Sequence, residues 1–317
     1  MKRKVSQIGP STLMVSLPTK WVKEHNVRKG DELDVSTEQN QVYFSITERK
    51  VKNRKCTLDI SQFSQYSLAR YLEMCYIHNY NEISLFYQNT EIANVKGKSK
   101  KIQHYIKNLT NQFIGMEIIS QTAQATELQC FSLSDEDTPD KIEKRIFFLW
   151  NEYVGEFLQA LREGIVPTQE EMQDKHDTLE RFIKYFLRVL LNSERTEAEK
   201  IQLYSFYTSL SPAVDRFKFI AEMLRDKKWR KELYLHLEEF FMFISHLFTA
   251  LHKNKMDPEL EKERYRLIQS VISTQKFSSA ELKVLFEARL LLDVYGEFYR
   301  VMIIRNLRNL DHKLARE

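Results

Sequence analysis

The segment from Arg3 to Asp31 reads RKVSQIGPSTLMVSLPTKWVKEHNVRKGD, and it decides how the N-terminal part of the chain folds. Apolar residues recur at every second position in two runs, a spacing that predicts β-strands, at Leu13, Val15 and Leu17 and again at Leu33 and Val35. Between these runs, Pro18 suits the first turn of a helix because its missing N–H has no intrahelical partner there. Gly30 suits a tight turn. The predicted order is therefore strand, short basic helix, turn and strand.

Cations flank these predicted elements. Lys20 and Lys23 lie three residues apart and therefore share one face of the predicted helix. Arg3 and Lys4 enter the first strand, and Trp21 is left to anchor the helix on its sheet. Two cations on one exposed helix face are suited to contacts with backbone phosphates.

This order of elements resembles the swapped-hairpin DNA-binding domain of the AbrB/SpoVT/MazE class. The resemblance implies a β-barrel that two chains close together, and hence a homodimer that contacts double-stranded DNA. Bacterial members carry a basic loop after the glycine, whereas this chain has Gly9-Pro10-Ser11-Thr12 and lacks a base-reading arginine there. Hydroxyl groups can still bond phosphates or base edges. The expected DNA-contacting residues are Arg3, Lys4, Ser11, Thr12, Lys20 and Lys23. The alternative is a barrel that serves only for dimerisation.

The distribution of charge also separates the N-terminal part from the rest. Residues 1–55 hold 12 lysines and arginines against 6 aspartates and glutamates, whereas the remaining residues hold 36 against 38. The whole-chain net charge of +4 therefore hides a basic N-terminal part on a nearly neutral remainder. Clustered positive charge indicates a polyanionic partner, and dimerisation would double it across a two-fold axis. Charge alone does not show whether the partner is DNA or an anionic membrane. The alternative is that the basic face is only solvated and binds no partner.

Length and composition limit the remaining possibilities. At 317 residues, 43% of them hydrophobic, the chain is long enough for two or three domains with apolar cores. Only 7 glycines and 6 prolines favour long regular elements, most of them helices. No signal peptide and no run of eighteen apolar residues is visible in the sequence. We therefore expect a cytoplasmic protein without membrane insertion.

Three domains are expected along the chain: a head at 1–52, an α/β connector at 56–134 and a helical part at 135–317. Lys50–Lys55 is interpreted as a basic hinge. In the connector, alternation and helical spacing predict strands at Cys56–Ile60, Glu82–Tyr87, Gly115–Ile119 and Leu128–Phe131, and helices at Ser67–His78 and Ile102–Phe113. The basic run Lys96–Lys101 lacks the Walker spacing, so a solvated loop is expected there instead of a phosphate-binding loop.

From Asp135 onward the pattern is helical. Acidic residues that favour a helix N-terminus open a first helix that runs to Gly164. Further helical runs are expected at about 168–192, 196–226, 228–254, 257–274 and 278–314. Six helices in two sets of three, each ending with a long helix, predict a bundle built from a duplicated three-helix unit. Pro212 removes a helical donor and is expected to kink or interrupt its helix, at a cost of roughly 3 kcal/mol if unrelieved.

A second resemblance covers the connector and the bundle. The stretch NQFIGMEIISQT at 111–122 looks like the linker domain of archaeal phosphate-uptake regulators of the PhoU type, which carry an AbrB-like head. The stretch LSPAVDRFKFIAE at 210–222 is similar to the third helix of the PhoU bundle, and Glu180-Arg181-Phe182 with Arg188 matches its second helix. The resemblance implies two three-helix repeats with a sensory or interaction role in phosphate homeostasis.

Members of that family bind metal clusters through carboxylates spaced four apart, because such residues face the same way and can share a hard cation. Of this pattern the chain keeps Asp215, with Ser211 in place of the first acid and Glu222 further on. In the second repeat Asp293 is preceded four residues earlier by Arg289, a cation that would oppose metal binding. We therefore expect neither a metal nor another cofactor.

Other groups of reactive residues indicate no catalytic chemistry. Cys56, Cys75 and Cys130 are odd in number and widely spaced, so neither a disulfide framework nor a zinc knuckle is indicated. His176 and Asp177 are adjacent and are expected to diverge by about 100° around a helix. No Ser-His-Asp or Cys-His arrangement has a supporting strand-turn context. The protein is therefore not expected to be an enzyme.

Taken together, the patterns predict a multidomain α+β protein that regulates transcription, with a DNA-binding head and a sensory or interaction bundle. The resemblance adds phosphate uptake as the regulated process. The alternative is an adaptor that does not bind DNA, whose bundle docks on a phosphate transporter or a signalling kinase and whose head only dimerises. A third possibility is an antitoxin-like system, although the head continues directly into the α/β part and no toxin-binding tail follows it.

Overall fold

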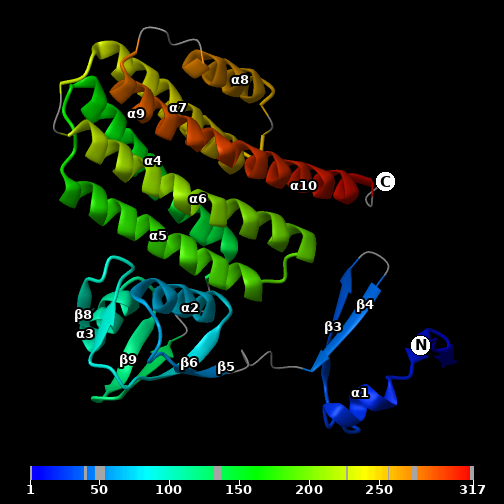
Figure 1. Cartoon of the computed structure of the whole chain (residues 1–317). Coiled ribbons are helices and arrows are strands. Elements are labelled where there is room, and N and C mark those ends of the chain that lie inside the picture. Colours follow the sequence, from blue (N-terminus) through cyan, green and yellow to red (C-terminus); the bar gives the residue numbers. More distant parts are fainter. Residues whose placement is uncertain are drawn as a thin grey trace. The chain divides into compact units, whose positions relative to one another are not determined.

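The computed structural model describes residues 2–38, 41–46, 54–131, 137–225, 228–255, 257–272 and 277–314. The chain divides into two compact units, the head at residues 1–52 and the body at residues 53–317. Figure 1 shows the elements of each unit. Most of the hinge expected at Lys50–Lys55 lies outside the described residues, as do the helix ends expected at 226 and at 273–274.

The head consists of two β-hairpins and one short helix. β1 (Val5–Ile8) pairs antiparallel with β2 (Thr12–Val15), and β3 (Leu33–Glu38) pairs antiparallel with β4 (Gln41–Ile46). Helix α1 (Thr19–Glu24) follows β2 in the sequence. The predicted order of strand, helix, turn and strand is therefore confirmed. Among the described residues the hairpins form two separate two-stranded sheets.

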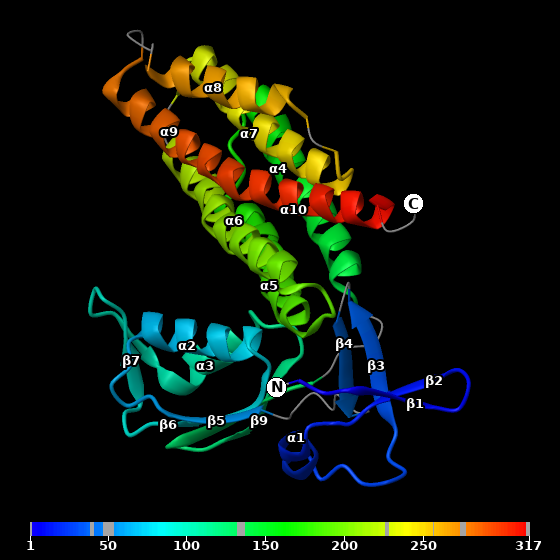
Figure 2. The same cartoon turned by 90° about the vertical axis from the view of Figure 1, so that its right-hand side faces the viewer.

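The body begins with an α/β part. A four-stranded sheet has the order β5 (Arg54–Asp59), β6 (Tyr80–Phe86), β10 (Ala125–Cys130) and β9 (Met116–Gln121), with β5 parallel to β6 and the other neighbours antiparallel. Helices α2 (Gln65–Ile77) and α3 (Ile102–Thr110) cover one face of this sheet, as Figure 2 shows. The strands and helices expected here from the sequence are present, and α3 ends at Thr110 instead of Phe113.

The basic run Lys96–Lys101 is only partly a loop, which corrects the expectation from the sequence. β7 (Glu91–Ala93) and β8 (Ser99–Lys101) form a small antiparallel hairpin. In its turn, the backbone N–H groups of Lys96 and Lys98 donate to the Asn94 side chain at 2.9 and 3.0 Å. These donors are used within the turn and are therefore not available to cradle a phosphate.

The rest of the body is helical. Its α-helices are α4 (Pro139–Arg162), α5 (Gln169–Asn192), α6 (Glu197–Leu224), α7 (Lys231–His252), α8 (Glu259–Ile272), α9 (Ser279–Arg289) and α10 (Val294–Leu314). Capping boxes at Thr168, Thr196 and Ser278 fix the starts of α5, α6 and α9, because each hydroxyl and the glutamate three residues later satisfy free N–H groups. None of the helices in the described ranges combines the length and the hydropathy that crossing a membrane requires.

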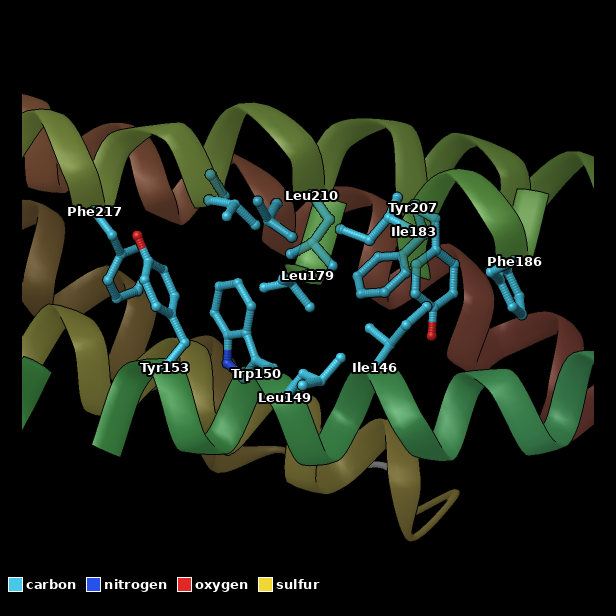
Figure 3. Close-up of a cluster of buried hydrophobic side chains, with 14 of the residues drawn as sticks. Ile146, Leu149, Trp150, Tyr153, Leu179, Ile183, Phe186, Tyr207, Leu210 and Phe217 are labelled. Atoms are coloured by element: carbon cyan, nitrogen blue, oxygen red, sulfur yellow. The ribbon is translucent and has the colours of Figure 1, made fainter. Parts of the chain in front are cut away.

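Aromatic rings fill the centre of the bundle, as the close-up in Figure 3 shows. Trp150 of α4 stacks on Phe248 of α7 with ring centroids 4.5 Å apart. Phe217 of α6 meets Trp150 edge-on at 5.4 Å and is fully buried. α4 packs against α5 and α7, whereas α6 packs against α5, α9 and α10. The helical spacing of apolar residues therefore places one stripe of each helix in a shared core.

The last predicted helix, at 278–314, is not continuous. A 3₁₀ turn at Leu290–Asp293 separates α9 from α10. The Nε group of Arg264 in α8 donates to the carbonyl of Leu292 at 3.3 Å, and a side chain that bonds a helix carbonyl is one cause of a local break. Leu291 and Leu292 are both buried, so the tighter turn also packs two consecutive residues inward.

Of the kink or interruption expected at Pro212, the interruption is wrong, because α6 runs without a break from Glu197 to Leu224, whereas the kink stays a prediction. Proline frees the carbonyl of Thr208, four residues earlier. Both Pro212 and Thr208 are exposed, so water can satisfy that carbonyl. Leu210 and Val214 on the opposite side of α6 are fully buried and hold the helix in the bundle.

Arg188 joins the α/β part to the bundle. It lies in α5, which packs against α2, and its guanidinium donates to the carbonyl of Tyr76 and, at 2.5 Å, to the side chain of Asn81. The guanidinium also lies over the Tyr76 ring, 4.8 Å from the centroid. Asn79 donates to the carbonyl of Arg188 at 3.2 Å. The arginine that carries part of the PhoU resemblance therefore has a structural role in this chain.

Candidate nucleic-acid interface

The β1–β2 hairpin carries four of the six residues expected to contact DNA. Arg3 and Lys4 directly precede β1, Ser11 lies in the turn, and Thr12 opens β2. All four are exposed. The hairpin therefore presents two cations at its open end and two hydroxyl groups at its turn.

The turn of this hairpin has a defined geometry. Gly9 adopts a φ of 76°, a conformation that would strain a residue with a side chain. The side-chain amide of Gln7 donates to the carbonyl of Pro10 at 3.2 Å, which closes the turn across its base. Ser11 directly follows Pro10 and is exposed.

Helix α1 carries the other two candidates, Lys20 and Lys23. The carbonyl of Pro18, which caps the helix, accepts the N–H of Val22 at 3.0 Å. Nζ of Lys20 lies 3.8 Å from the Glu24 carboxylate, but the Lys20 side chain is 89% exposed. Such a surface pair contributes little stability and is easily exchanged. Lys23 is exposed as well, so both amines are accessible to a phosphate.

Two further cations, Arg28 and Lys29, were not among the candidates chosen from the sequence. Asp31 closes the turn that contains them: its carboxylate accepts the Arg28 N–H at 2.7 Å, and its own N–H donates to the Arg28 carbonyl at 3.1 Å. Gly30 supplies the positive φ of 96° that the turn requires. Both cations are exposed. The signal that would have found them is the clustering of charge that distinguishes the head.

Of the head residues whose exposure is described, none is buried. Val5, Leu13 and Val15 are 61%, 68% and 49% exposed, and the register of β1 and β2 places all three on one face of the hairpin. In the other hairpin Val35 is paired with Phe44, and both are exposed. Apolar faces on both hairpins leave water only when another surface covers them.

A second polar group lies in the body, between α5 and α6. His176 is buried, with Nδ1 at 2.9 Å from Asp177 and Nε2 at 2.8 Å from Asp215. The side chains of His176 and Asp177 were expected to point in different directions around the helix. This expectation is wrong, because the imidazole contacts the carboxylates of both Asp177 and Asp215. Burial opposes the charged imidazole, but hydrogen bonds to Asp177 and Asp215 outweigh it and raise the pKa of His176 to about 9.

Neighbouring groups in the bundle respond differently to burial. The hydrogen bond from His176 lowers the pKa of Asp215, whereas burial raises the pKa of Glu180. Oε1 of Glu180 and the hydroxyl of Tyr153 are buried and have no hydrogen-bond partner among the described residues. The group around His176 therefore combines one satisfied pair of charges with two unsatisfied polar atoms.

The three acids considered as remnants of a metal motif, Asp215, Glu222 and Asp293, lie in different surroundings in this structure. Asp215 accepts from His176, Glu222 is exposed in the last turn of α6, and Asp293 is exposed in the 3₁₀ turn. Arg289, four residues before Asp293, is the last residue of α9. Within the described ranges, no cluster of three or more His, Cys, Asp or Glu side chains is arranged to hold a metal ion.

A comparison with known families matches the head. The family described as "Antidote-toxin recognition MazE, bacterial antitoxin" matches residues 7–43, from within β1 to within β4. The match supports the AbrB/MazE type for the head, and it does not reach the body. No curated protein matches the chain, and no solved structure does.

Proposed function

We propose that the chain is a homodimeric regulator whose head binds double-stranded DNA and whose bundle senses a signal or docks a partner. The observation that carries the proposal is the exposed, basic head of AbrB/MazE type, in which the match at residues 7–43 contains α1 and the β1–β2 turn. A domain of this type is consistent with DNA binding. The proposal assigns no catalytic reaction and no cofactor to the chain.

Contacts with backbone phosphates are expected to supply most of the affinity. Lys20 and Lys23 are three residues apart on α1, and Arg3 and Lys4 lie next to the first strand. Lysines and arginines that neutralise phosphates release condensed counterions, which makes the affinity strongly salt-dependent. The short hydroxyl side chains of the β1–β2 turn leave few groups to read bases, so sequence preference is expected to be modest.

Dimerisation follows from the apolar faces of the hairpins. Val5, Leu13 and Val15 form one such face and are exposed in the single chain. A second copy of the head presents the same face, and two-fold symmetry lets identical patches cover each other. The dimer would also place two sets of cations along one DNA duplex.

Fluorescence anisotropy of labelled genomic fragments with the full chain tests DNA binding. If the dimer neutralises about six phosphates, the logarithm of affinity falls with the logarithm of salt concentration at a slope of about −5. Changing Lys20→Ala and Lys23→Ala together removes four cations from a dimer, so the slope is expected to weaken to about −2. A flat salt response of the unmodified protein contradicts the proposal.

The matched control changes Lys96→Ala and Lys98→Ala, two exposed lysines in the β7–β8 turn of the body. This control removes the same charge from the dimer outside the head, so affinity and salt slope are expected to stay unchanged. Equal losses from the two double variants would show that net charge, not the head, governs binding.

A second candidate function is an adaptor that does not bind DNA. The observation that favours it is the β1–β2 turn, Gly9–Thr12, which offers no cation to a base edge. An adaptor still dimerises but shows no binding to genomic fragments at low salt. Its partner would be a phosphate transporter or a signalling kinase, and that link to phosphate rests on the resemblance at 111–122 and 210–222 alone. Genomic footprinting at high and low phosphate tests the same link for a DNA-binding regulator.

A further inference from the structure

Two cysteines that are far apart in the sequence meet in the α/β part. Cys56 lies in β5, an edge strand of the sheet, and Cys75 lies near the end of α2. Their Sγ atoms are 3.6 Å apart. Both are free thiols, Cys75 is buried, and Cys56 is partly exposed. The two cysteines are 19 residues apart, so they match no short cysteine motif and the sequence alone does not indicate the pair.

A hydrogen bond beside the cysteine pair joins β5 to the C-terminus of α2. Nη1 of Arg54, two residues before Cys56, donates at 3.0 Å to the carbonyl of His78, which caps the C-terminus of α2. A disulfide bond has an S–S length of about 2.05 Å. The two sulfur atoms must therefore approach each other by about 1.5 Å before the bond forms.

The two thiols have different proton affinities. The hydrogen bond between the two side chains lowers the pKa of the Cys56 thiol despite the opposing effect of burial. The same interaction, with burial, raises the pKa of Cys75 far above its ordinary value. Burial also raises the pKa of Cys130, to about 11. Cys56 is therefore both the most exposed of the three thiols and the one that most readily forms a thiolate.

We propose that Cys56 and Cys75 form a reversible dithiol site that reacts with hydroperoxides, with Cys56 as the attacking thiol and Cys75 as the resolving thiol. Nothing in the DNA-binding proposal requires this site, and nothing in this site requires DNA binding. The arrangement has two features of a redox-active pair, which are a partly exposed thiol and a second thiol within contact distance.

The reaction proceeds in two balanced steps. The Cys56 thiolate attacks one oxygen of the peroxide, so that an S–O bond forms, the O–O bond breaks, and the second oxygen leaves as hydroxide or alkoxide and takes up a proton. The Cys75 sulfur then attacks the sulfenic acid on Cys56, forming the S–S bond, and the departing hydroxide leaves as water with the Cys75 proton. Two thiols lose two electrons in total, and one peroxide is reduced.

The test treats the folded full chain with hydrogen peroxide and then counts free thiols after denaturation. The count is expected to fall from three to one and to return to three with dithiothreitol. Mass spectrometry of unreduced peptides is expected to find Cys56 joined to Cys75 within one chain. Three unchanged thiols, a disulfide that contains Cys130, or a disulfide between chains would each overturn the proposal.

Serine variants give the matched controls. Cys130→Ser is expected still to lose two thiols, whereas Cys56→Ser retains both of its remaining thiols. Cys75→Ser removes the resolving thiol, so the sulfenic acid on Cys56 is expected to persist and to be trapped by dimedone. In the unmodified protein, iodoacetamide near pH 7 is expected to label Cys56 about tenfold faster than Cys75 or Cys130. Equal labelling rates for the three thiols contradict the assignment of Cys56 as the attacking group.

Discussion

The helical bundle buries many large apolar side chains, whereas the head leaves several of its apolar side chains exposed to water. In the bundle Trp150, Phe217 and Phe241 are fully buried among other rings. In the head Val5 and Leu13 are more than half exposed. Burying one large apolar side chain stabilises a fold by about 1.5–3 kcal/mol, and that gain is absent while the side chain stays in water. One chain therefore completes the core of the bundle but not that of the head.

The two regions are therefore expected to differ in whether their stability depends on protein concentration. A unit whose core is complete unfolds at a denaturant concentration that does not depend on protein concentration. A unit that needs a second copy becomes more stable as protein concentration rises, by mass action. Changing one apolar residue in each region and measuring which kind of stability is lost tests this difference.

The largest effect is expected in the bundle, from Phe217→Ala. The ring of Phe217 packs against those of Trp150, Tyr153, Phe157 and Phe241. Removing a buried phenylalanine leaves a cavity and costs about 3–5 kcal/mol. Urea unfolding followed by circular dichroism measures the loss, which is expected to be independent of protein concentration.

The matched control is Phe219→Ala, two residues further along α6. Phe219 is 46% exposed, so its removal is expected to cost less than about 1 kcal/mol. Similar losses from the two variants would mean that the aromatic core is not where the stability of the bundle resides.

A smaller effect is expected in the head, from Leu13→Asp. If the face formed by Val5, Leu13 and Val15 is covered by a second copy, a carboxylate on that face is buried without a partner and costs about 2–4 kcal/mol of dimerisation energy. The dimer dissociation constant is then expected to rise at least about thirtyfold. Analytical ultracentrifugation over a range of protein concentrations measures this constant.

Ser6→Asp provides the control for the head. Ser6 lies in the same strand, is exposed, and faces away from Leu13 because neighbouring strand residues point to opposite faces. The same charge is therefore introduced without reaching the proposed interface, and the dimer is expected to persist. A dimer that survives Leu13→Asp would place the contact between copies elsewhere.

Local patterns predicted elements better than contacts in both regions. Alternation located β2, β3 and the four strands of the main sheet, and helical spacing located most of the helices. The alternation did not predict β7 and β8, which have three residues each and bury only Ile92. The sequence pattern also did not predict the break between α9 and α10, because the break involves Arg264 in another helix. Periodicity reports on one element at a time and carries no information about such partners.

The candidate sites show the same limit. The six residues chosen for DNA contact are exposed on a hairpin and a helix, as a surface site requires, and their role in DNA binding stays a prediction. The pairs Cys56 with Cys75 and His176 with Asp215 join residues 19 and 39 positions apart. Neither pair follows a short motif, because each is created by packing between elements.

The smallest effect is expected from the charged group around His176 inside the bundle, and it depends on pH. Burial opposes a charge on His176, but Asp177 and Asp215 raise its pKa to about 9, above the ordinary value of 6.5. The stabilisation from this pair is therefore fully present below pH 6.5 and is lost as the pH rises through about 9. The groups that face it are Asp177 and Glu180 on α5, Asp215 and Lys218 on α6, Tyr153 on α4 and Arg70 on α2.

Asp215→Asn is expected to cost about 1–2 kcal/mol at pH 7, because the Asp215 side chain is 63% exposed and solvent screens the pair. The difference between variant and unmodified protein is expected to shrink at pH 10, where His176 is neutral in both. Urea unfolding at the two pH values measures it. The control is Glu263→Gln, which breaks the pair with His246 at 3.2 Å, and since His246 is 48% exposed, the expected cost is below about 0.5 kcal/mol. A loss from Asp215→Asn that is equal at pH 7 and pH 10 would show that Asp215 acts through packing and not through the charge of His176.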